Sequence, residues 1–208
     1  GCSPLDLSVY NAQVIVIPAP VADAGDNATI CETDSYTLAD ADPQNYSTVS
    51  WSTSGDGTFD DPTSPNPTYT PGTDDIDNGT VELCQTVQPI DPCTMTDTDC
   101  MILEIQAAPI AFAGSDATIC QDLSFTLLGG VLNACDWSWS TTGDGTFDDP
   151  SSLLTDYTPG PNDKLNGEVD LCLTADPCVP CADPAVDCMT LFISQNPTVE
   201  ITSPADGA

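Results

Sequence analysis

Apolar and polar residues alternate along several short stretches of the chain. Val81 and Leu83 fall on one face of one stretch, while Met101, Leu103 and Ile105 fall on one face of another. Because successive side chains of a β-strand point to opposite faces, this period of two predicts half-buried strands. Asp-Gly and Pro-Gly turn sequences separate the stretches, and the chain shows no long amphipathic helical pattern. The pattern therefore predicts an all-β fold of many short strands.

The same pattern occurs twice along the chain. The segment Trp51–Pro62 recurs almost unchanged as Trp139–Pro150, and Ala28–Cys31 recurs as Ala117–Cys120. Three cysteines of the first copy also have counterparts in the second: Cys84 with Cys172, Cys93 with Cys181, and Cys100 with Cys188. Self-similarity at a fixed spacing is the sequence signature of tandem repeats.

The repeats set the expected domain organisation. Four parts follow from the spacing: the last strand of a preceding repeat at 1–18, complete repeats at 19–107 and 108–195, and the first strand of a following repeat at 196–208. Trp51 and Trp139 match the tryptophan that immunoglobulin-like sandwiches bury between their two sheets. We therefore predict tandem immunoglobulin-like β-sandwich repeats, cut from a longer array.

Eleven cysteines are a high count for a chain of 208 residues. Structural zinc sites usually combine paired Cys-x-x-Cys motifs or added histidines, whereas this chain has one such motif, Cys178 to Cys181, and no histidine. Disulfides formed in an oxidising, extracellular compartment are the favoured interpretation, and free thiols in the core are the alternative. A secreted or cell-surface location follows from the disulfide interpretation.

The strand pattern restricts how the cysteines pair. If Cys84 and Cys100 lie on adjacent antiparallel strands whose loop is centred on Pro92, the two face each other on the side away from the core. Cys172 and Cys188 follow by the same reasoning. The remaining expected bonds are Cys31–Cys93, Cys120–Cys181 and Cys135–Cys178, with Cys2 bonded to a partner outside the chain. An exchange of partners among the loop cysteines stays open.

Acidic residues dominate the charge of the chain. There are 33 Asp and Glu against a single Lys, which gives a formal charge of −32. Such a chain lacks the cations needed to bind nucleic acid, and anionic membranes repel it. No apolar run approaches the roughly 18 residues of a membrane-spanning helix, so we expect no membrane insertion. The absence of His excludes Ser-His-Asp and Cys-His catalysis. A hydrophobic fraction of 40% nevertheless argues for a folded chain.

Clustered aspartates have two interpretations. In the sequence Ser-Gly-Asp-Gly-Thr-Phe-Asp-Asp they form a tight hairpin turn, or they bind Ca²⁺, which takes about six to eight oxygen ligands. The candidate calcium ligands are Asp23, Asp26, Asp56, Asp60, Asp61, Asp74, Asp75, Asp116, Asp144, Asp148, Asp149 and Asp163. A third interpretation is an acidic surface adapted to salt, with cations held only loosely.

The repeated motifs also resemble a known group of proteins. The run Ala-Gly-x-x-Ala-Thr-Ile-Cys, followed by Trp-Ser-Thr-x-Gly-Asp-Gly-Thr-Phe-Asp-Asp-Pro, Tyr-Thr-Pro-Gly and a late Pro-Cys, resembles PKD-like and immunoglobulin-like repeats. Those repeats occur in giant secreted surface proteins of Bacteroidetes-type bacteria, among them adhesins and gliding-motility filament proteins. The resemblance implies export and a role as stalk, adhesin or extracellular fibre. The additional cysteines Cys84, Cys100, Cys172 and Cys188 depart from the commoner repeats.

These observations favour a structural function. We expect a repeat segment of an extracellular filament or adhesin stalk, stiffened by disulfides and by calcium where it binds. Its expected partners are neighbouring repeats of the chain and other copies in a filament. The alternative is a binding module that recognises a surface glycan or a protein. An enzyme is disfavoured, because catalysis needs one site and the acidic motif is present in each repeat.

Overall fold

A computed structural model describes residues 16–196. Most of the two predicted end segments, together with Cys2, lies outside the described residues. The described residues divide into two compact units, one formed by 16–28 and 35–104 and the other by 29–34 and 105–196. The division differs from the predicted repeat boundaries, because 29–34 belongs to the first sequence repeat but to the second unit.

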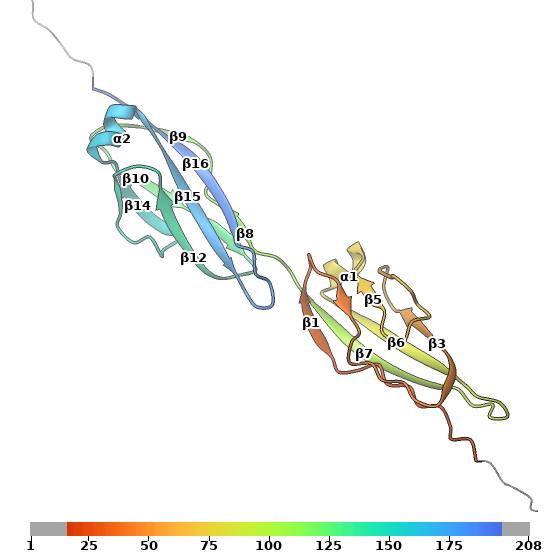
Figure 1. Ribbon diagram of the computed structural model, residues 1–208. Helices are drawn as coiled ribbons and strands as arrows, with labels where there is room; N and C mark the ends of the chain where they lie inside the picture. The colour runs from red at the N-terminus through yellow and green to blue at the C-terminus, as the bar shows by residue number, and fades with distance from the viewer. Residues whose placement is uncertain (1–15, 197–208) are drawn as a thin grey trace, which may run out of the picture. The chain divides into compact units, whose positions relative to one another are not determined.

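The first unit contains two β-sheets, and the strand pairs β2–β5, β4–β5, β3–β6 and β6–β7 are antiparallel (Figure 1). The larger sheet has the order β1-β7-β6-β3, with β1 at Ala28–Cys31, β3 at Tyr46–Thr53, β6 at Thr80–Pro89 and β7 at Asp97–Gln106. Most of β1 and the last two residues of β7 belong to this sheet although the division counts them with the second unit. The smaller sheet has the order β2-β5-β4, with β2 at Tyr36–Thr37, β4 at Thr58–Phe59 and β5 at Thr68–Thr70. A short helix, α1 at Thr73–Asn78, precedes β6.

The second unit repeats this plan with one addition. Its larger sheet has the order β12-β15-β16-β9, with β9 at Ala117–Cys120, β12 at Ala134–Thr141, β15 at Glu168–Pro177 and β16 at Ala185–Ser194. Its smaller sheet has the order β10-β14-β13, with β10 at Phe125–Leu128, β13 at Thr146–Phe147 and β14 at Leu154–Thr158. The helix α2 spans Pro161–Asn166. The additional pair is β8 at Ile110–Phe112 with β11 at Gly130–Leu132.

The core of each unit consists of the apolar positions that the alternation predicts. In the second unit Leu171 and Leu191 are fully buried and pack with Leu127 and Tyr157 of the smaller sheet, so the two sheets face each other. Trp139 lies in this core, and Trp51 is equally buried in the first unit. The fold is thus an all-β sandwich of immunoglobulin-like type that carries disulfides, which confirms the predicted fold class.

The first strand of the larger sheet runs parallel to the last one in the second unit. Ala117 of β9 lies opposite Leu191 of β16, and Cys120 lies opposite Ser194, the final residue of β16. The other strand pairs recorded for this sheet are antiparallel. The parallel pairing decides which end of the sheet the cysteine of β9 occupies, and the cysteine connectivity depends on it.

Candidate functional site

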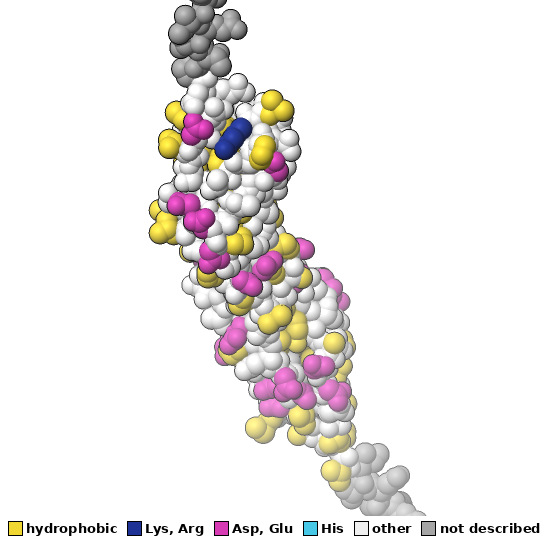
Figure 2. Space-filling model, turned by 90° about the vertical axis from the view of Figure 1, so that its left-hand side faces the viewer, with side chains coloured by type: hydrophobic (Ala, Val, Ile, Leu, Met, Phe, Trp, Pro, Cys, Tyr) yellow, Lys and Arg dark blue, Asp and Glu magenta, His cyan; other side chains and the backbone are white. Residues whose placement is uncertain are grey.

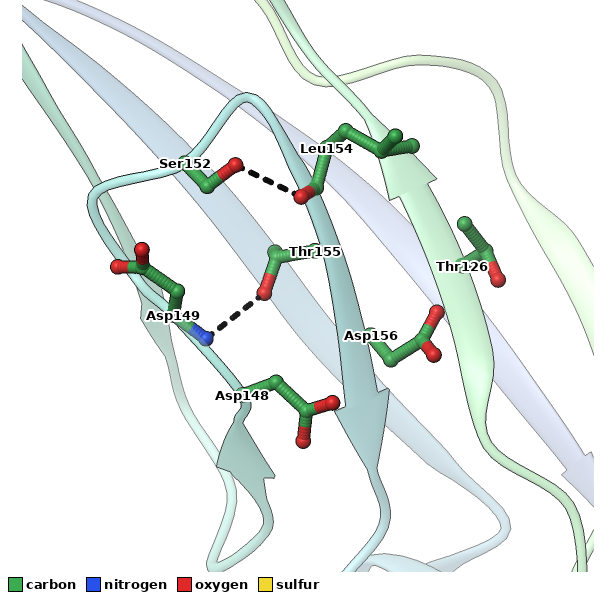
Figure 3. A pocket seen from close by; sticks show the side chains of 7 residues that line it. All are labelled: Thr126, Asp148, Asp149, Ser152, Leu154, Thr155 and Asp156. Carbon is green, nitrogen blue, oxygen red and sulfur yellow. Dashed lines mark hydrogen bonds between the residues drawn. The ribbon is translucent and has the colours of Figure 1, made fainter.

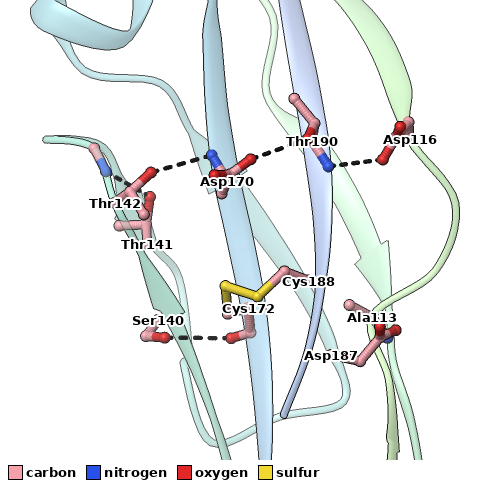
Figure 4. The surroundings of a disulfide bond; sticks show 11 residues. Ala113, Asp116, Ser140, Thr141, Thr142, Asp170, Cys172, Asp187, Cys188 and Thr190 are labelled. Atoms are coloured by element: carbon pink, nitrogen blue, oxygen red, sulfur yellow. Dashed lines mark hydrogen bonds between the residues drawn. A yellow bond between two sulfur atoms is a disulfide. The ribbon is translucent and has the colours of Figure 1, made fainter.

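Two hairpins carry a disulfide at the same place. In the first unit Cys84 lies directly opposite Cys100 in the register of β6 and β7, with a Cα–Cα distance of 4.1 Å. In the second unit Cys172 and Cys188 lie opposite each other on β15 and β16 at 4.0 Å (Figure 4). On β6 and β15 both neighbours of the cysteine are buried whereas the cysteine is not, so both bonds lie on the outer face of the sheet. The structure thus pairs these cysteines as the hairpin register predicts.

A third bond occurs only in the second unit. Cys135 of β12 is bonded to Cys178, which follows β15, at a Cα–Cα distance of 5.0 Å. The sequence predicts the same pair, because neither residue has a counterpart in the first repeat.

The fourth bond differs from the expected one. Cys31 is bonded to Cys181, so the expected pairs Cys31–Cys93 and Cys120–Cys181 are wrong. The physical reason is the parallel pairing of the first and last strands. Cys120 lies beside the last residue of β16, whereas Cys181 precedes its first residue, and a strand of ten residues is about 33 Å long. A disulfide requires Cα atoms within about 7 Å, so the cysteines at the two ends of one strand cannot bond.

The Cys31–Cys181 bond connects segments that belong to different sequence repeats. Its two cysteines are 150 residues apart in the chain, and each side chain is 5% exposed. Cys93 and Cys120 remain as thiols among the described residues, the first half-buried and the second exposed. No sequence signal distinguished this connectivity, because the strand order alone decides which cysteine lies at which end.

Two of the predicted calcium ligands are buried carboxylates that hydrogen-bond to their own loop. Asp163 is 1% exposed and accepts hydrogen bonds from the backbone N–H groups of Asp144, Gly145 and Gly160 and from the Tyr157 hydroxyl. Asp75 is equally buried and accepts the corresponding bonds in the first unit, including a 2.6 Å bond from Tyr69. Four donors therefore already surround each of these carboxylates.

The aspartate of each Asp-Gly turn accepts hydrogen bonds from backbone N–H groups in the first turn of the short helix. The Asp56 carboxylate accepts hydrogen bonds from the backbone N–H groups of Asp74 and Asp75 at 3.1 and 3.3 Å. Asp144 does the same with Asn162 and Asp163. The two short helices were not predicted. They exist because this exchange of hydrogen bonds satisfies the N–H groups of their first turn.

These contacts shift the ionisation of the buried pair in the second unit. Burial, followed by the hydrogen bond to Asp163, raises the pKa of Tyr157 to about 12. Burial alone would raise the pKa of Asp163, but the hydrogen bonds from Tyr157, Gly160, Asp144 and Gly145 outweigh it and lower that pKa. In the first unit burial and the bond to Asp75 raise the pKa of Tyr69 to about 12. In the second unit Tyr157 is thus held neutral beside the charged carboxylate of Asp163.

Of the two consecutive aspartates that follow each repeated phenylalanine, Phe59 and Phe147, the second accepts hydrogen bonds in the next turn. The Asp61 and Asp149 carboxylates accept hydrogen bonds from the side chain and the backbone N–H of Thr63 and Ser151 respectively, and these bonds lower the pKa of both aspartates. Asp60 accepts hydrogen bonds from the N–H groups of Asp61 and Thr68.

In the second unit the carboxylates of this turn border an open depression of about 370 Å³. Its lining residues are Thr126, Asp148, Asp149, Ser152, Leu154, Thr155 and Asp156 (Figure 3). In the first unit a threonine, Thr68, corresponds to Asp156, so the most acidic form of this surface belongs to the second unit.

The remaining predicted ligands lie near the first strand of each larger sheet or on α1. Asp116 accepts a hydrogen bond from the N–H of Thr190 on β16 at 2.8 Å (Figure 4), and Asp23 accepts one from Gly25. Asp26 and Asp74 are exposed. Asp99 and Asp187 are not among the predicted site residues. They accept hydrogen bonds from the N–H groups of Ala24 and Ala113 and thereby hold the segment before the first strand.

The predicted calcium ligands do not converge in threes. Among the described residues, the group of three acidic or cysteine side chains close enough to share a metal ion is Glu82, Cys84 and Cys100, whose atoms lie within 4.8 Å of one another. Cys84 and Cys100 are bonded to each other and offer no thiolate. Calcium binding stays a prediction.

On the face shown in Figure 2 the acidic residues are spread rather than gathered. Figure 2 shows carboxylates distributed among uncharged polar side chains, with the single lysine in dark blue. Within residues 16–196 the structure contains no helix with the length and apolar character needed to cross a membrane.

Comparison with known proteins identifies the fold alone. No known protein family matches the chain, and no curated protein matches it either. Similar solved structures include mouse cadherin-23 EC22-24, with a TM-score of 0.51 and 11% identity over 85% of this chain and 66% of that one. A three-domain immunoglobulin structure from titin has a TM-score of 0.48 and 12% identity over 86% of this chain and 67% of that one. Drosophila N-cadherin EC1-4 has a TM-score of 0.49 and 13% identity over 86% of this chain and 50% of that one.

The cadherin-23 likeness shows an immunoglobulin-like or cadherin-like β-sandwich fold. The chain spans between half and about two thirds of the length of these three structures. The four disulfides of the described residues are of the kind that form in an oxidising, extracellular compartment.

Proposed function

We propose that the chain is a structural segment of a long extracellular filament or adhesin stalk, of the kind found in giant secreted surface proteins of Bacteroidetes-type bacteria. The observation that supports this most is the Cys31–Cys181 bond, which connects the first strand of one sequence repeat to a loop of the next. A disulfide of this kind braces consecutive repeats against separation. No catalytic function is proposed.

The bond changes how the chain carries tension. A force applied at the two ends passes through the backbone to Cys31, across the disulfide, and onward from Cys181. The segment between these residues, 150 positions long, is bypassed and bears no load while the bond is intact. The load then falls on the residues outside this segment, which include β1 and β16, while the other strands of both sandwiches are shielded.

The test of this function is direct imaging of the native material under non-denaturing conditions. We expect threads in which β-sandwich modules of this kind follow one another. Isolated globular particles would contradict the proposal.

Calcium is proposed as an additional stabiliser of the segment. Its support is the formal charge of −32, since a surface with a single cation repels itself unless ions screen it. The melting temperature in the presence of calcium should be several degrees higher than that in the presence of a chelator, since a ligand bound to the native state stabilises it by mass action. Equal melting temperatures at constant ionic strength would contradict calcium binding and would show that cations only screen the surface charge.

The alternative function is a binding module for a surface glycan or a protein. The specific observation that favours it is the polar depression beside Asp148, Asp149 and Asp156, whose carboxylates can accept hydrogen bonds from sugar hydroxyls. Glycan arrays probed with the 208-residue chain test it. A saturable ligand lost in Asp156→Ala but retained in Asp183→Ala would favour the binding module.

A further inference from the structure

We propose that Cys93 and Cys120 are complementary coupling sites for further repeats of this kind. Cys93 accepts the strand-end cysteine of a preceding repeat, and Cys120 bonds the loop cysteine of a following one. The inference rests on the proposed array in naming its partner. It goes beyond that proposal because it assigns one unbonded thiol to the bond with the preceding repeat and the other to the bond with the following repeat.

The bonded pair in the structure defines the two halves of the connection. Cys31 is the last residue of β1, after Ala-Thr-Ile, and Cys181 follows a proline in the loop between β15 and β16. Each half has an unbonded counterpart in the other repeat. Cys120 ends β9 after the same Ala-Thr-Ile, and Cys93 follows a proline in the loop between β6 and β7.

The surroundings of Cys93 match those of its bonded counterpart. The Cys181 Sγ lies 3.5 Å from the carbonyl oxygen of Gln106, and the Cys93 Sγ lies 3.7 Å from the carbonyl oxygen of Ile17. Ile17 and Gln106 occupy equivalent positions, at the same distance before the Ala-Gly sequence of each repeat. Cys93 is therefore held as Cys181 is held while it is bonded to Cys31.

The surroundings of Cys120 match those of Cys31 in the same way. The residue after Cys31, Glu32, donates its N–H to the carbonyl of Gln106 at the end of β7, at 2.9 Å. The residue after Cys120, Gln121, donates to Ser194 at the end of β16, at 3.0 Å. Each strand-end cysteine thus lies beside the exit of the last strand of its sheet, where the chain continues toward the next repeat.

Accessibility and charge allow the reaction. Cys120 is exposed and Cys93 is half-buried, whereas each cysteine of the bonded pair is 5% exposed. Acidic neighbours do not prevent the bond, because Glu32 and Asp183 lie close in sequence to the two cysteines that are already joined.

The chemistry is thiol–disulfide exchange. Two thiols lose two protons and two electrons to a small-molecule disulfide such as oxidised glutathione, which is reduced to two thiols. In the first step one thiolate displaces a glutathione thiolate to give a mixed disulfide. In the second step the other cysteine displaces the remaining glutathione and forms the protein disulfide.

The test uses two variants that each retain one of the two thiols. Cys2→Ser with Cys93→Ser retains Cys120, which is converted to a mixed disulfide with an aromatic thiol. Cys2→Ser with Cys120→Ser retains Cys93 and supplies the attacking thiolate. Attack by Cys93 on the Cys120 sulfur forms the protein–protein disulfide and releases the coloured aromatic thiolate, whose absorbance gives the rate. High salt screens the repulsion between the acidic chains.

The matched controls are the two homotypic mixtures, Cys120 with activated Cys120 and Cys93 with activated Cys93. Each rate is divided by the rate at which glutathione reacts with the same activated chain, which corrects for the exposure of the two sulfurs. We expect the Cys93–Cys120 mixture to exceed both homotypic mixtures by about tenfold or more, because a matching surface orients the reacting atoms. Equal normalised rates would overturn the proposal, while the proposed filament, which depends on Cys31–Cys181, would stand.

Disulfide mapping of native material distinguishes where the partner repeat lies. A peptide that links the Cys93 loop to an Ala-Thr-Ile-Cys strand supports the coupling. If the mass of the native protein falls on reduction, the partner repeat lies on a second chain. If that mass is unchanged, the partner repeat lies on the same chain. Cys93 and Cys120 alkylated as free thiols throughout native material would overturn the coupling.

Discussion

At the residue scale, Asp163 is a buried carboxylate whose oxygens accept four hydrogen bonds. Asp163→Asn places an amide N–H₂ group among N–H and O–H donors. Because an amide nitrogen cannot accept these hydrogen bonds, some of the four are lost. We expect the second unit to lose about 2–3 kcal/mol of unfolding free energy, the range for hydrogen bonds to a buried charge. Denaturant unfolding measures it, with the exposed Asp183→Asn as control. A loss below that of the control would contradict this account.

The same carboxylate predicts the direction of an acid transition. Hydrogen bonds lower the pKa of Asp163 in the folded chain below its ordinary value of 3.8. Its contribution to stability is therefore fully present above pH 3.8 and is lost as the pH falls through the folded pKa. We expect the stability difference between the chain and Asp163→Asn to shrink below pH 3.8. A difference that stayed constant in acid would show that the charge is not what stabilises this loop.

The buried tyrosines predict an alkaline transition of the opposite sign. Their pKa is raised from 10.0 to about 12, so the neutral form is favoured in the folded state. Stability is present below pH 10 and lost as the pH rises toward 12. Tyrosinate absorbance should show Tyr69 and Tyr157 ionising well above the ordinary tyrosine pKa of 10.0. Tyr157→Phe should remove one late-titrating group, whereas ionisation of both residues near pH 10 would contradict the buried pair.

The role of these residues could be predicted from the sequence only in part. The Asp-Gly turn was one of two stated interpretations, and the turn contacts of Asp56 and Asp144 agree with it. Asp75 and Asp163 were predicted as candidate calcium ligands, and their role as buried hydrogen-bond acceptors was not predicted. Their burial depends on the short helix that brings them back over the hairpin, and a one-turn helix leaves no periodicity to detect.

At the element scale, the hairpin disulfide of each unit closes a loop of 16 residues. Cys84→Ser with Cys100→Ser should lower the unfolding free energy of the first unit by about 3 kcal/mol in the chain-entropy model. The matched variant, Cys172→Ser with Cys188→Ser, should lower that of the second unit by a similar amount. Tryptophan fluorescence during chemical unfolding measures both. Unchanged midpoints would show that the strand pairing needs no covalent support.

The turn glycines predict a further effect at this scale. A Cβ at Gly143 would lie 1.9 Å from the Asp163 Oδ1, so Gly143→Ala must displace the buried carboxylate. We expect a loss of more than about 2 kcal/mol, because burial without hydrogen bonds is costly. Gly130→Ala is the control, since the nearest atom to its Cβ is 3.9 Å away. Similar melting temperatures for the two variants would contradict the tight fit.

Strand pairing also explains which disulfides were predicted. Cys84–Cys100 and Cys172–Cys188 follow from the geometry of a hairpin, in which one register positions both residues. Cys31 and Cys93 belong to strands and loops that are distant in sequence, and the alternating pattern does not tell a parallel neighbour from an antiparallel one. The expected bond within each repeat was wrong for that reason.

At the scale of the whole molecule, the repeats and the sandwich fold follow from the sequence because self-similarity and alternation are both local patterns. The connection between the repeats does not follow from it, since the Cys31–Cys181 bond spans 150 residues and depends on where each strand ends. The bond gives the chain a covalent path that bypasses the segment between its two cysteines. The account of the molecule as a mechanical segment depends on it.

Single-molecule stretching of the 208-residue chain from its two ends tests that path most directly. In the oxidised chain the bond should hide the 150-residue segment, so that only the terminal segments extend. Reduction of the disulfides should expose roughly 500 Å of additional length at about 3.4 Å per residue. Oxidised Cys31→Ser, which retains the other three bonds, should extend to an intermediate length. An oxidised chain that extends as far as the reduced one would contradict the account.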